Sequence, residues 1–282
     1  MISMNRLTPL FSVLLAASLH AADSKGFDIP GMKHDIEFAK AGDVSLTLDA
    51  FVPPGDGPFI TCILVHGGGF TKGDKQTFIK PLFEPLAKAN FVWFTINYRL
   101  APQHAWPACA DDVASAIKWV KLHASEYKAD PKRIALIGES AGGHLVSWAG
   151  VTGEGDTAVA AVVPFYAPHD LTIQVKRRKE LGGLGGLIGT DELNDAAWKK
   201  LADISPMNRV VPGLPPFLQL HGDKDTTVPL EQSILFQEKM KAAGNQCELI
   251  TVAGGIHGMS GWQKLGSDYQ EQLVGWLRKT LK

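Results

Sequence analysis

Residues 133–142, RIALIGESAG, decide the fold, because an apolar strand runs here directly into a G-x-S-x-G motif. The next seven residues are typical of a helix, so the serine lies at a strand-to-helix junction. Such a turn is strained, exposes the serine hydroxyl and requires small neighbours. Gly138, Ala141 and Gly142 supply that room. The motif predicts that Ser140 is a nucleophile, and a serine in an ordinary strand-helix turn is the alternative.

Short apolar runs alternate with amphipathic stretches along most of the chain, which predicts a mostly parallel, doubly wound α/β sheet. Polar and apolar residues alternate over residues 34–52, with a Gly-Asp turn between two runs, and predict an antiparallel N-terminal hairpin. The predicted parallel strands cover residues 60–65, 91–97, 133–137, 160–165, 216–220 and 248–252. The predicted helices cover residues 79–89, 111–123, 140–150, 230–243 and 267–281.

One interval, about residues 168–212, interrupts this alternation and predicts a small lid-like insertion at the edge of the sheet. It contains a basic run at 176–179, a glycine-rich run at 181–187 and a helical stretch at 195–201. The glycines lack the Lys-Ser or Lys-Thr that follows a phosphate-binding loop, which argues against nucleotide binding. The basic run is interpreted as a solvated helix face, with contact to an acidic substrate as the alternative.

Charge and cysteine content exclude several classes of protein. The chain has 28 Lys and Arg against 29 Asp and Glu, a net charge of -1, so we expect no nucleic-acid partner. Cys62, Cys109 and Cys247 are too few and too dispersed for a disulfide framework or a metal site. One disulfide remains open as an alternative, and it leaves at least one thiol unpaired.

Residues 1–22 resemble a secretory signal peptide. Arg6 precedes an apolar run at residues 7–19, and the small residues Ala21 and Ala22 follow. The run is shorter than the ~20 residues that a membrane-spanning helix needs, so stable membrane insertion is the weaker interpretation. We therefore expect removal of this segment and a periplasmic or secreted mature protein.

A serine nucleophile needs a base, a group that orients the base, and donors for the developing oxyanion. Among nine histidines, His257 is the preferred base, because it follows the last predicted strand in a loop at the carboxyl edge of the sheet. Asp223 and Asp225 follow the strand at 216–220, and either one can orient the base or cap its loop. The chain order Ser, Asp, His is that of an α/β-hydrolase triad.

Other histidines and a glycine run complete this set of predictions. The run at residues 67–69 follows a strand and exposes backbone amides, which together with the amide of Ala141 predict an oxyanion hole. His144 is assigned a packing role, whereas His66 and His221 are expected to hold loops in shape.

The sequence is similar to α/β-hydrolases of the esterase and lipase group, including hormone-sensitive-lipase-like carboxylesterases and bacterial feruloyl and acetyl-xylan esterase-like proteins. The resemblance covers nearly all of residues 23–282 and implies a single α/β-hydrolase catalytic domain. It places the catalytic acid at Asp225 rather than Asp223, makes the amides of Gly68, Gly69 and Ala141 the oxyanion donors, and implies no metal or organic cofactor. The matching residues lie at 66–69, 97–102, 104, 107, 111–112, 138–145 and 215–218.

The resemblance implies an acyl-enzyme mechanism on a small-molecule or carbohydrate ester, and residues 142–145, 221–222 and 228–229 favour the feruloyl and acetyl-xylan branch. We expect short-chain or carbohydrate-linked acyl groups of acetyl or feruloyl type. A general short-chain carboxylesterase and an arylformamidase are the alternatives, and a non-catalytic binding protein on a hydrolase scaffold is a more remote one. The acyl group, the alcohol and the oligomeric state stay open.

Overall fold

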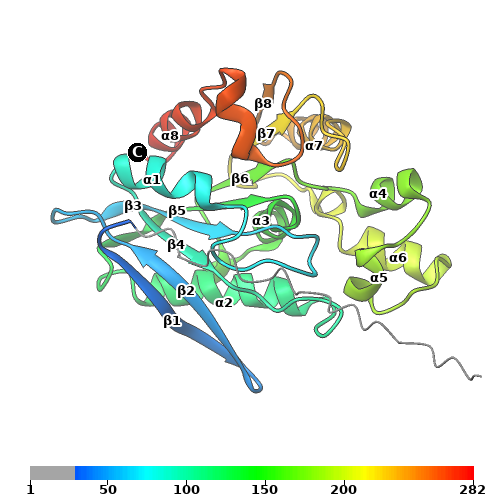
Figure 1. Ribbon diagram of the computed structural model, residues 1–282, viewed down its shortest axis with the longest axis horizontal. Coiled ribbons are helices and arrows are strands. Elements are labelled where there is room, and N and C mark those ends of the chain that lie inside the picture. Colours follow the sequence, from blue (N-terminus) through cyan, green and yellow to red (C-terminus); the bar gives the residue numbers. More distant parts are fainter. Residues whose placement is uncertain (1–28) are drawn as a thin grey trace, which may run out of the picture.

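The protein is built around an eight-stranded mixed sheet (Figure 1). A computed structural model describes residues 29–282, so the predicted signal peptide lies outside the described residues and stays a prediction. The strands are β1 (Met32–Ala41), β2 (Val44–Phe51), β3 (Phe59–Val65), β4 (Val92–Ile96), β5 (Ala129–Glu139), β6 (Ala161–Phe165), β7 (Phe217–Gly222) and β8 (Cys247–Val252). No helix in the described part of the chain has the length and apolar character that crossing a membrane requires.

The strand order is β1-β2-β4-β3-β5-β6-β7-β8. β1 pairs with β2 and β2 with β4 in antiparallel fashion, whereas every pair from β4 to β8 is parallel. The predicted fold class, an α/β sheet with an antiparallel N-terminal hairpin, is confirmed. The parallel strands end at a common edge, where loops that are far apart in the sequence meet.

Helices cover both faces of the sheet, and each face has its own apolar core. Buried side chains of α2 (Ala108–Leu122), α3 (Ala141–Thr152) and α7 (Glu231–Ala242) pack on one face. Those of α1 (Phe83–Lys88) and α8 (Tyr269–Thr280) pack on the other, and these two helices lie side by side in Figure 1. The short 3-10 helices η1 (Lys80–Leu82), η2 (Gly155–Thr157) and η4 (Met259–Leu265) lie in the connections.

The insertion between β6 and β7 folds into α4 (Leu171–Arg178), α5 (Gly183–Ile188), α6 (Asp195–Asp203) and the short η3 (Pro206–Arg209). Helix α5 was not expected, because its sequence contains three glycines and glycine disfavours helix. Tertiary packing decides it: Leu184, Leu187 and Ile188 are buried, and a Cβ on Gly186 would lie 2.9 Å from the Cβ of Pro102. The predicted basic run forms the exposed end of α4.

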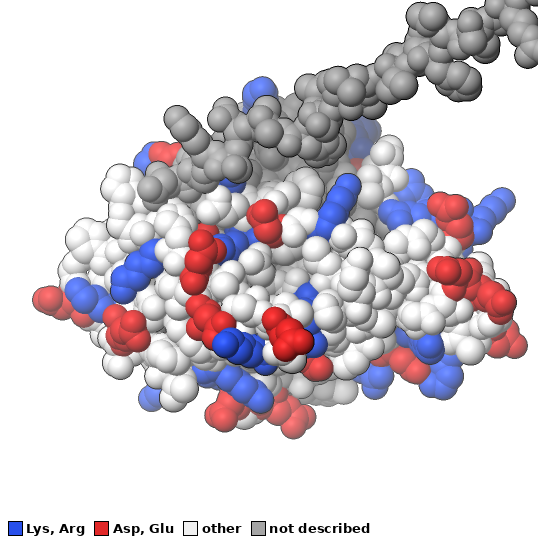
Figure 2. All heavy atoms as spheres, turned by 60° about the horizontal axis from the view of Figure 1, so that its bottom comes forward, with Lys and Arg blue, Asp and Glu red and all other residues white. Residues whose placement is uncertain are grey.

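Charged side chains of both signs are interspersed on the surface that Figure 2 presents, in keeping with the near-zero net charge. Cys62, Cys109 and Cys247 are all buried free thiols, so the disulfide left open by the sequence is not formed. Within residues 29–282, no cluster of His, Cys, Asp and Glu side chains is arranged to hold a metal ion.

An ion pair fastens the loop after β4 to helix α2. The Arg99 guanidinium donates through Nε and an Nη to the carboxylate of Asp112, with a shortest distance of 2.6 Å, and the Arg99 backbone N–H donates to the same carboxylate at 2.8 Å. Asp112 is only 2% exposed. Its carboxylate therefore links the loop to the helix through both side-chain and backbone donors.

We expect Asp112→Ala to lower the free energy of unfolding by about 3 kcal/mol, because it leaves the Arg99 cation and a backbone donor without their acceptor. Urea unfolding followed by circular dichroism measures this loss. Asp111→Ala is the matched control, since Asp111 is exposed on the same turn of α2, and it should change stability by less than about 0.5 kcal/mol. Equal effects of the two substitutions would contradict the role of the ion pair.

Candidate active site

Ser140 occupies the sharp turn between β5 and α3 that its motif predicts. Its backbone has φ 52° and ψ -115°, a strained conformation for a residue with a side chain. The turn is tightly packed: a Cβ on Gly138 would lie 2.3 Å from the Gly142 carbonyl oxygen, and one on Gly142 would lie 2.2 Å from that of Val65. The two glycines are required because backbone atoms fill the space that side chains would need.

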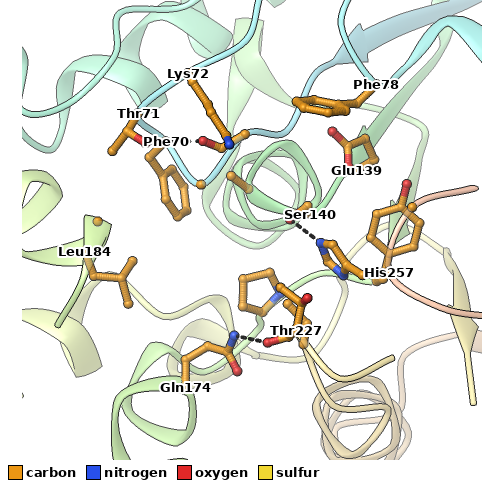
Figure 3. Close-up of a pocket in the computed structure, with 18 of the residues that line it drawn as sticks. Phe70, Thr71, Lys72, Phe78, Glu139, Ser140, Gln174, Leu184, Thr227 and His257 are labelled. Atoms are coloured by element: carbon orange, nitrogen blue, oxygen red, sulfur yellow. Dashed lines mark hydrogen bonds between the residues drawn. The ribbon is translucent and has the colours of Figure 1, made fainter. Parts of the chain in front are cut away.

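Three loops at the carboxyl edge of the sheet bring Ser140, His257 and Asp225 together. The Ser140 Oγ lies 2.9 Å from Nε2 of His257 (Figure 3). Nδ1 of His257 lies 2.6 Å from Oδ2 of Asp225. These distances allow the serine hydroxyl to donate to the imidazole, and the imidazole to donate to the carboxylate. The arrangement is that of a nucleophile, a base and an orienting acid.

The structure joins Asp225, and not Asp223, to the histidine. Asp225 is buried, and its Oδ1 accepts the N–H groups of Thr227 and Val228 at 2.8 and 2.9 Å. Burial acts to raise the pKa of Asp225, but hydrogen bonds from His221 and His257 more than offset it and hold the pKa well below its ordinary value. Asp223 is exposed and accepts the Gly254 N–H instead.

The residues that carry the predicted oxyanion donors, Gly68, Gly69 and Ala141, line the same pocket as Ser140. The glycine turn is held from behind by Tyr98, whose hydroxyl donates to the carbonyls of His66 and Gly67 at 3.0 and 3.1 Å. The Tyr98 ring also stacks on His66 at 4.3 Å. These contacts hold the carbonyls of residues 66 and 67 in place.

The glycine turn at residues 67–69 also requires glycine at its central position. Gly68 has φ +99°, and a Cβ there would lie 1.9 Å from the Lys72 carbonyl oxygen. The backbone thus folds back on itself within five residues and leaves the amides of the turn unobstructed by side chains. A rigid set of donors aimed at one point is what stabilisation of an oxyanion needs.

The other predicted histidines support loops around the site. His144 is fully buried and its Nδ1 donates to the carbonyl of Pro168, 2.8 Å away, where the insertion begins. His221 is also fully buried, and its Nε2 donates to the Val228 carbonyl at 2.9 Å within the loop that carries Asp225. Burial lowers the pKa of His144 to about 4, so its ring is neutral at physiological pH.

The pocket around Ser140 has a volume of about 440 Å³. Its walls come from the oxyanion turn, the histidine loop and the insertion, of which α4 and α5 contribute Leu171, Gln174 and Leu184. Figure 3 shows Leu184 and Gln174 on one side of Ser140 and Phe78 and His257 on the other. The insertion therefore forms one wall of the pocket.

A family of known proteins shares this sequence pattern: residues 48–240 match the model of the BD-FAE family. The chain belongs to the BD-FAE family. The family match ends before His257, so it does not include the histidine. The contact between His257 and Ser140 of this BD-FAE member is shown by the structure. The expected relationship to α/β-hydrolase esterases is confirmed.

Relatives of this BD-FAE protein carry hydrolase names. LipM of Mycobacterium tuberculosis, a probable carboxylic ester hydrolase, is 36% identical over 193 residues, which are 64% of this chain and 45% of LipM. The chain spans about half the length of the curated relatives it matches.

Solved structures give a fuller overlap. A truncated carbohydrate esterase from gut microbiota is 27% identical with a TM-score of 0.77, over 92% of this chain and 98% of that one. Thermogutta terrifontis esterase 2 phosphorylated by paraoxon is 28% identical with a TM-score of 0.71, over 89% of this chain and 95% of that one. Both are similar to this BD-FAE protein along almost their whole length.

Two residues that the sequence analysis did not assign a role, Glu139 and Tyr166, connect the oxyanion turn to the histidine loop. The Glu139 carboxylate accepts the backbone N–H of Gly67 and the hydroxyl of Tyr166. The Tyr166 hydroxyl accepts the N–H of Met259 at 3.2 Å, and the Tyr166 ring contacts that of His257 edge-on, with centroids 4.8 Å apart. We call Glu139 and Tyr166 the carboxylate brace.

The brace explains both a glycine and an unusual acid. A Cβ on Gly67 would lie 2.1 Å from Oε1 of Glu139, so glycine is needed where the carboxylate meets the turn. Burial raises the pKa of Glu139 to about 7, against the opposing effects of the Gly67 hydrogen bond and of nearby His257. The signal in the sequence was a carboxylate beside the nucleophile, but the motif admits any residue at that position.

We expect Asp225→Asn to reduce ester turnover by about 10³- to 10⁴-fold, because an amide cannot hold the imidazole in the same tautomer or stabilise its charged form. Steady-state hydrolysis of p-nitrophenyl acetate measures the change. Asp223→Asn is the matched control and should stay within about threefold of wild type, since among the described residues the Asp223 side chain binds Gly254 and not the histidine. A large loss in Asp223→Asn with none in Asp225→Asn would reverse the assignment.

Glu139→Gln tests the raised pKa of the brace. A carboxyl whose pKa is higher in the folded than in the unfolded protein makes its full contribution to stability below about pH 4.5. This contribution is lost as the pH rises through about 7. Gln does not titrate, so wild type should lose stability relative to Glu139→Gln between pH 5 and 8, by up to about 3 kcal/mol. Urea unfolding of both proteins across this range measures it, and a constant difference would show that Glu139 ionises normally.

Proposed function

We propose that the protein is a serine carboxylic-ester hydrolase that acts on short-chain or carbohydrate-linked acyl esters of acetyl or feruloyl type. The observation that carries the proposal is the continuous chain of contacts from Ser140 through His257 to Asp225, beside a glycine turn that lines the same pocket. These parts suit acyl transfer, because a nucleophile, its base and oxyanion donors surround one reacting carbon.

Acylation follows from this geometry. As the Ser140 Oγ attacks the ester carbonyl carbon, its proton passes to Nε2 of His257, 2.9 Å away. The negative charge that develops on the carbonyl oxygen is received by the amides of Gly68, Gly69 and Ala141. Asp225, held ionised by its hydrogen bonds, stabilises the imidazolium.

The tetrahedral intermediate then collapses. The bond between the acyl carbon and the alcohol oxygen breaks, and His257 returns its proton to that oxygen, so the alcohol leaves neutral. A water molecule takes the vacated place, gives a proton to His257 and attacks the acyl-enzyme, and Ser140 recovers its proton as the acid is released. The carboxylate brace positions the turn and the histidine loop through both steps, without touching the reacting atoms.

The preference for short or carbohydrate-linked acyl groups is supported by the pocket and by the relatives. A pocket of about 440 Å³, with one wall formed by α4 and α5, suits a small acyl group. A carbohydrate esterase overlaps 92% of this chain, and LipM is named a probable carboxylic ester hydrolase. Thermogutta terrifontis esterase 2 is phosphorylated by paraoxon, which makes an organophosphate a suitable probe of Ser140.

The test is a rate panel of p-nitrophenyl acetate, butyrate and octanoate, methyl ferulate and acetylated xylan, with wild type, Ser140→Ala and the control Ser115→Ala. We expect Ser140→Ala to lose at least about 10³-fold in turnover and to resist labelling by a fluorophosphonate, while the fold stays intact. Ser115 lies on α2 away from the pocket and should behave as wild type. Retention of wild-type rates by Ser140→Ala would overturn the mechanism.

The substrates separate the remaining alternatives. Release of acetate from xylan would assign the carbohydrate-ester specificity, and hydrolysis of methyl ferulate would assign the feruloyl one. Activity confined to short p-nitrophenyl esters would leave a general carboxylesterase. N-formylkynurenine, added to the panel, detects an arylformamidase. A folded wild-type protein that neither turns over nor takes the label would be a binding protein.

A further inference from the structure

A second cavity, of about 950 Å³, opens beside the catalytic pocket and runs between helices α1 and α8. The exposed side chains of Phe78 and Ser260 line both cavities, so the two cavities adjoin each other. One wall comes from η1 and α1, and the other from η4 and α8, the pair of helices at the upper left of Figure 1. We call this second cavity the α1–α8 groove.

The direction of catalysis places the alcohol part of the ester on the groove side. His257 must deliver a proton to the leaving oxygen, so the alcohol departs on the side of the imidazole. Ser260 follows His257 by three residues and begins the groove, and Figure 3 shows Phe78 on this same side of Ser140. The opposite side is closed by Leu171 and Leu184, which are buried and apolar and suit the acyl group.

The walls of the groove combine apolar surface with polar side chains and carry charges of both signs. The Lys88 Nζ lies 2.6 Å from Oε1 of Glu84, so this ion pair leaves that part of the wall without a net charge. Lys80 and Glu271 also line the groove, and their side chains have no hydrogen-bond or ion-pair partner among the described residues. Mixed, hydrogen-bonding walls of this kind suit a neutral polyhydroxylated ligand better than an ionic or a purely apolar one.

An exposed aromatic ring stands at the junction of the two cavities. Phe78 is 48% exposed, although burial is the usual state of phenylalanine, and its backbone has φ 64°. A bulky residue is rarely found in that conformation, so the surrounding chain must hold it there. A flat apolar ring among polar groups matches a sugar ring, which has an apolar face and a polar rim.

We propose that the α1–α8 groove binds the saccharide chain that carries the ester, so that an esterified oligosaccharide, and not a single sugar, is the preferred substrate. The proposal rests on the proposed esterase function and names its substrate class. From Glu271 to Arg278, the α8 wall is about 10 Å long by the helical rise, enough for more than one sugar ring. Phe78 is then the residue on which the sugar nearest the ester stacks.

Chain-length dependence tests the groove separately from the chemistry. The probes are acetylated xylose and acetylated xylo-oligosaccharides of two, four and six sugars, with p-nitrophenyl acetate as a substrate that ends in the catalytic pocket. For wild type, we expect kcat/KM to rise at least about tenfold from one sugar to four, as added sugars contribute binding. Phe78→Ala should lower kcat/KM for the tetramer more than for the monomer, and Phe78→Tyr should restore it.

Gly275→Trp blocks the groove away from the catalytic pocket. A Cβ on Gly275 meets no atom within 4 Å, so the ring enters open space on the α8 wall without displacing the core. We expect this variant to lose the about tenfold gain with chain length. Lys118→Trp, at an exposed position of α2 on the other face of the sheet, is the matched control and should keep the gain.

Each result decides between the two proposals. Hydrolysis of p-nitrophenyl acetate by wild type, with no gain from longer saccharides or with the gain kept in Gly275→Trp, would overturn the groove and leave the esterase function standing. Wild-type protein that hydrolyses none of the esters would overturn both. Far-ultraviolet circular dichroism and a thermal melt establish that each variant is folded before rates are compared.

Discussion

The close approach of backbones around Ser140 is the constraint on which the rest of the structure depends. The end of β5 and the first turn of α3 pack so tightly that a Cβ on Gly138 would lie 2.3 Å from the Gly142 carbonyl oxygen. Gly142 in turn presses on the end of β3, where the oxyanion turn begins. The strained serine and its oxyanion donors are therefore fixed by one set of contacts, which sets the direction from which an ester must approach.

A buried carboxylate transmits this rigidity across the site. Glu139 receives the N–H of Gly67 and the hydroxyl of Tyr166, and Tyr166 in turn holds the Met259 N–H and the edge of the His257 ring. Burying a carboxyl is unfavourable, as its raised pKa shows, so the brace opposes stability near neutral pH. In return, the turn and the histidine loop, which follow strands on opposite sides of β5, keep a fixed relation to Ser140.

Local sequence patterns predicted most of the strands and helices of this fold. Apolar runs predicted the parallel strands and the helices between them, because the periodicity of a buried segment depends only on residues that are neighbours in the chain. They failed at α5, where the glycines at 183, 185 and 186 oppose a helix and contacts with the oxyanion turn and Pro102 favour it. The choice between Asp223 and Asp225 came from family resemblance, since two aspartates two positions apart look alike in a sequence.

By itself, the sequence indicated the nucleophile, the glycine turn and most of the strands and helices in their succession along the chain, since each depends on residues close together in the chain. Only the tertiary structure decided which groups meet: Ser140 and His257 are 117 positions apart, and Gly67 and Glu139 are 72 apart. The same holds for the α1–α8 groove, whose walls begin near residue 78 and residue 260. Such contacts follow from the order of the strands within the sheet, which brings the ends of distant parallel strands to a single edge. No local sequence pattern predicts that order.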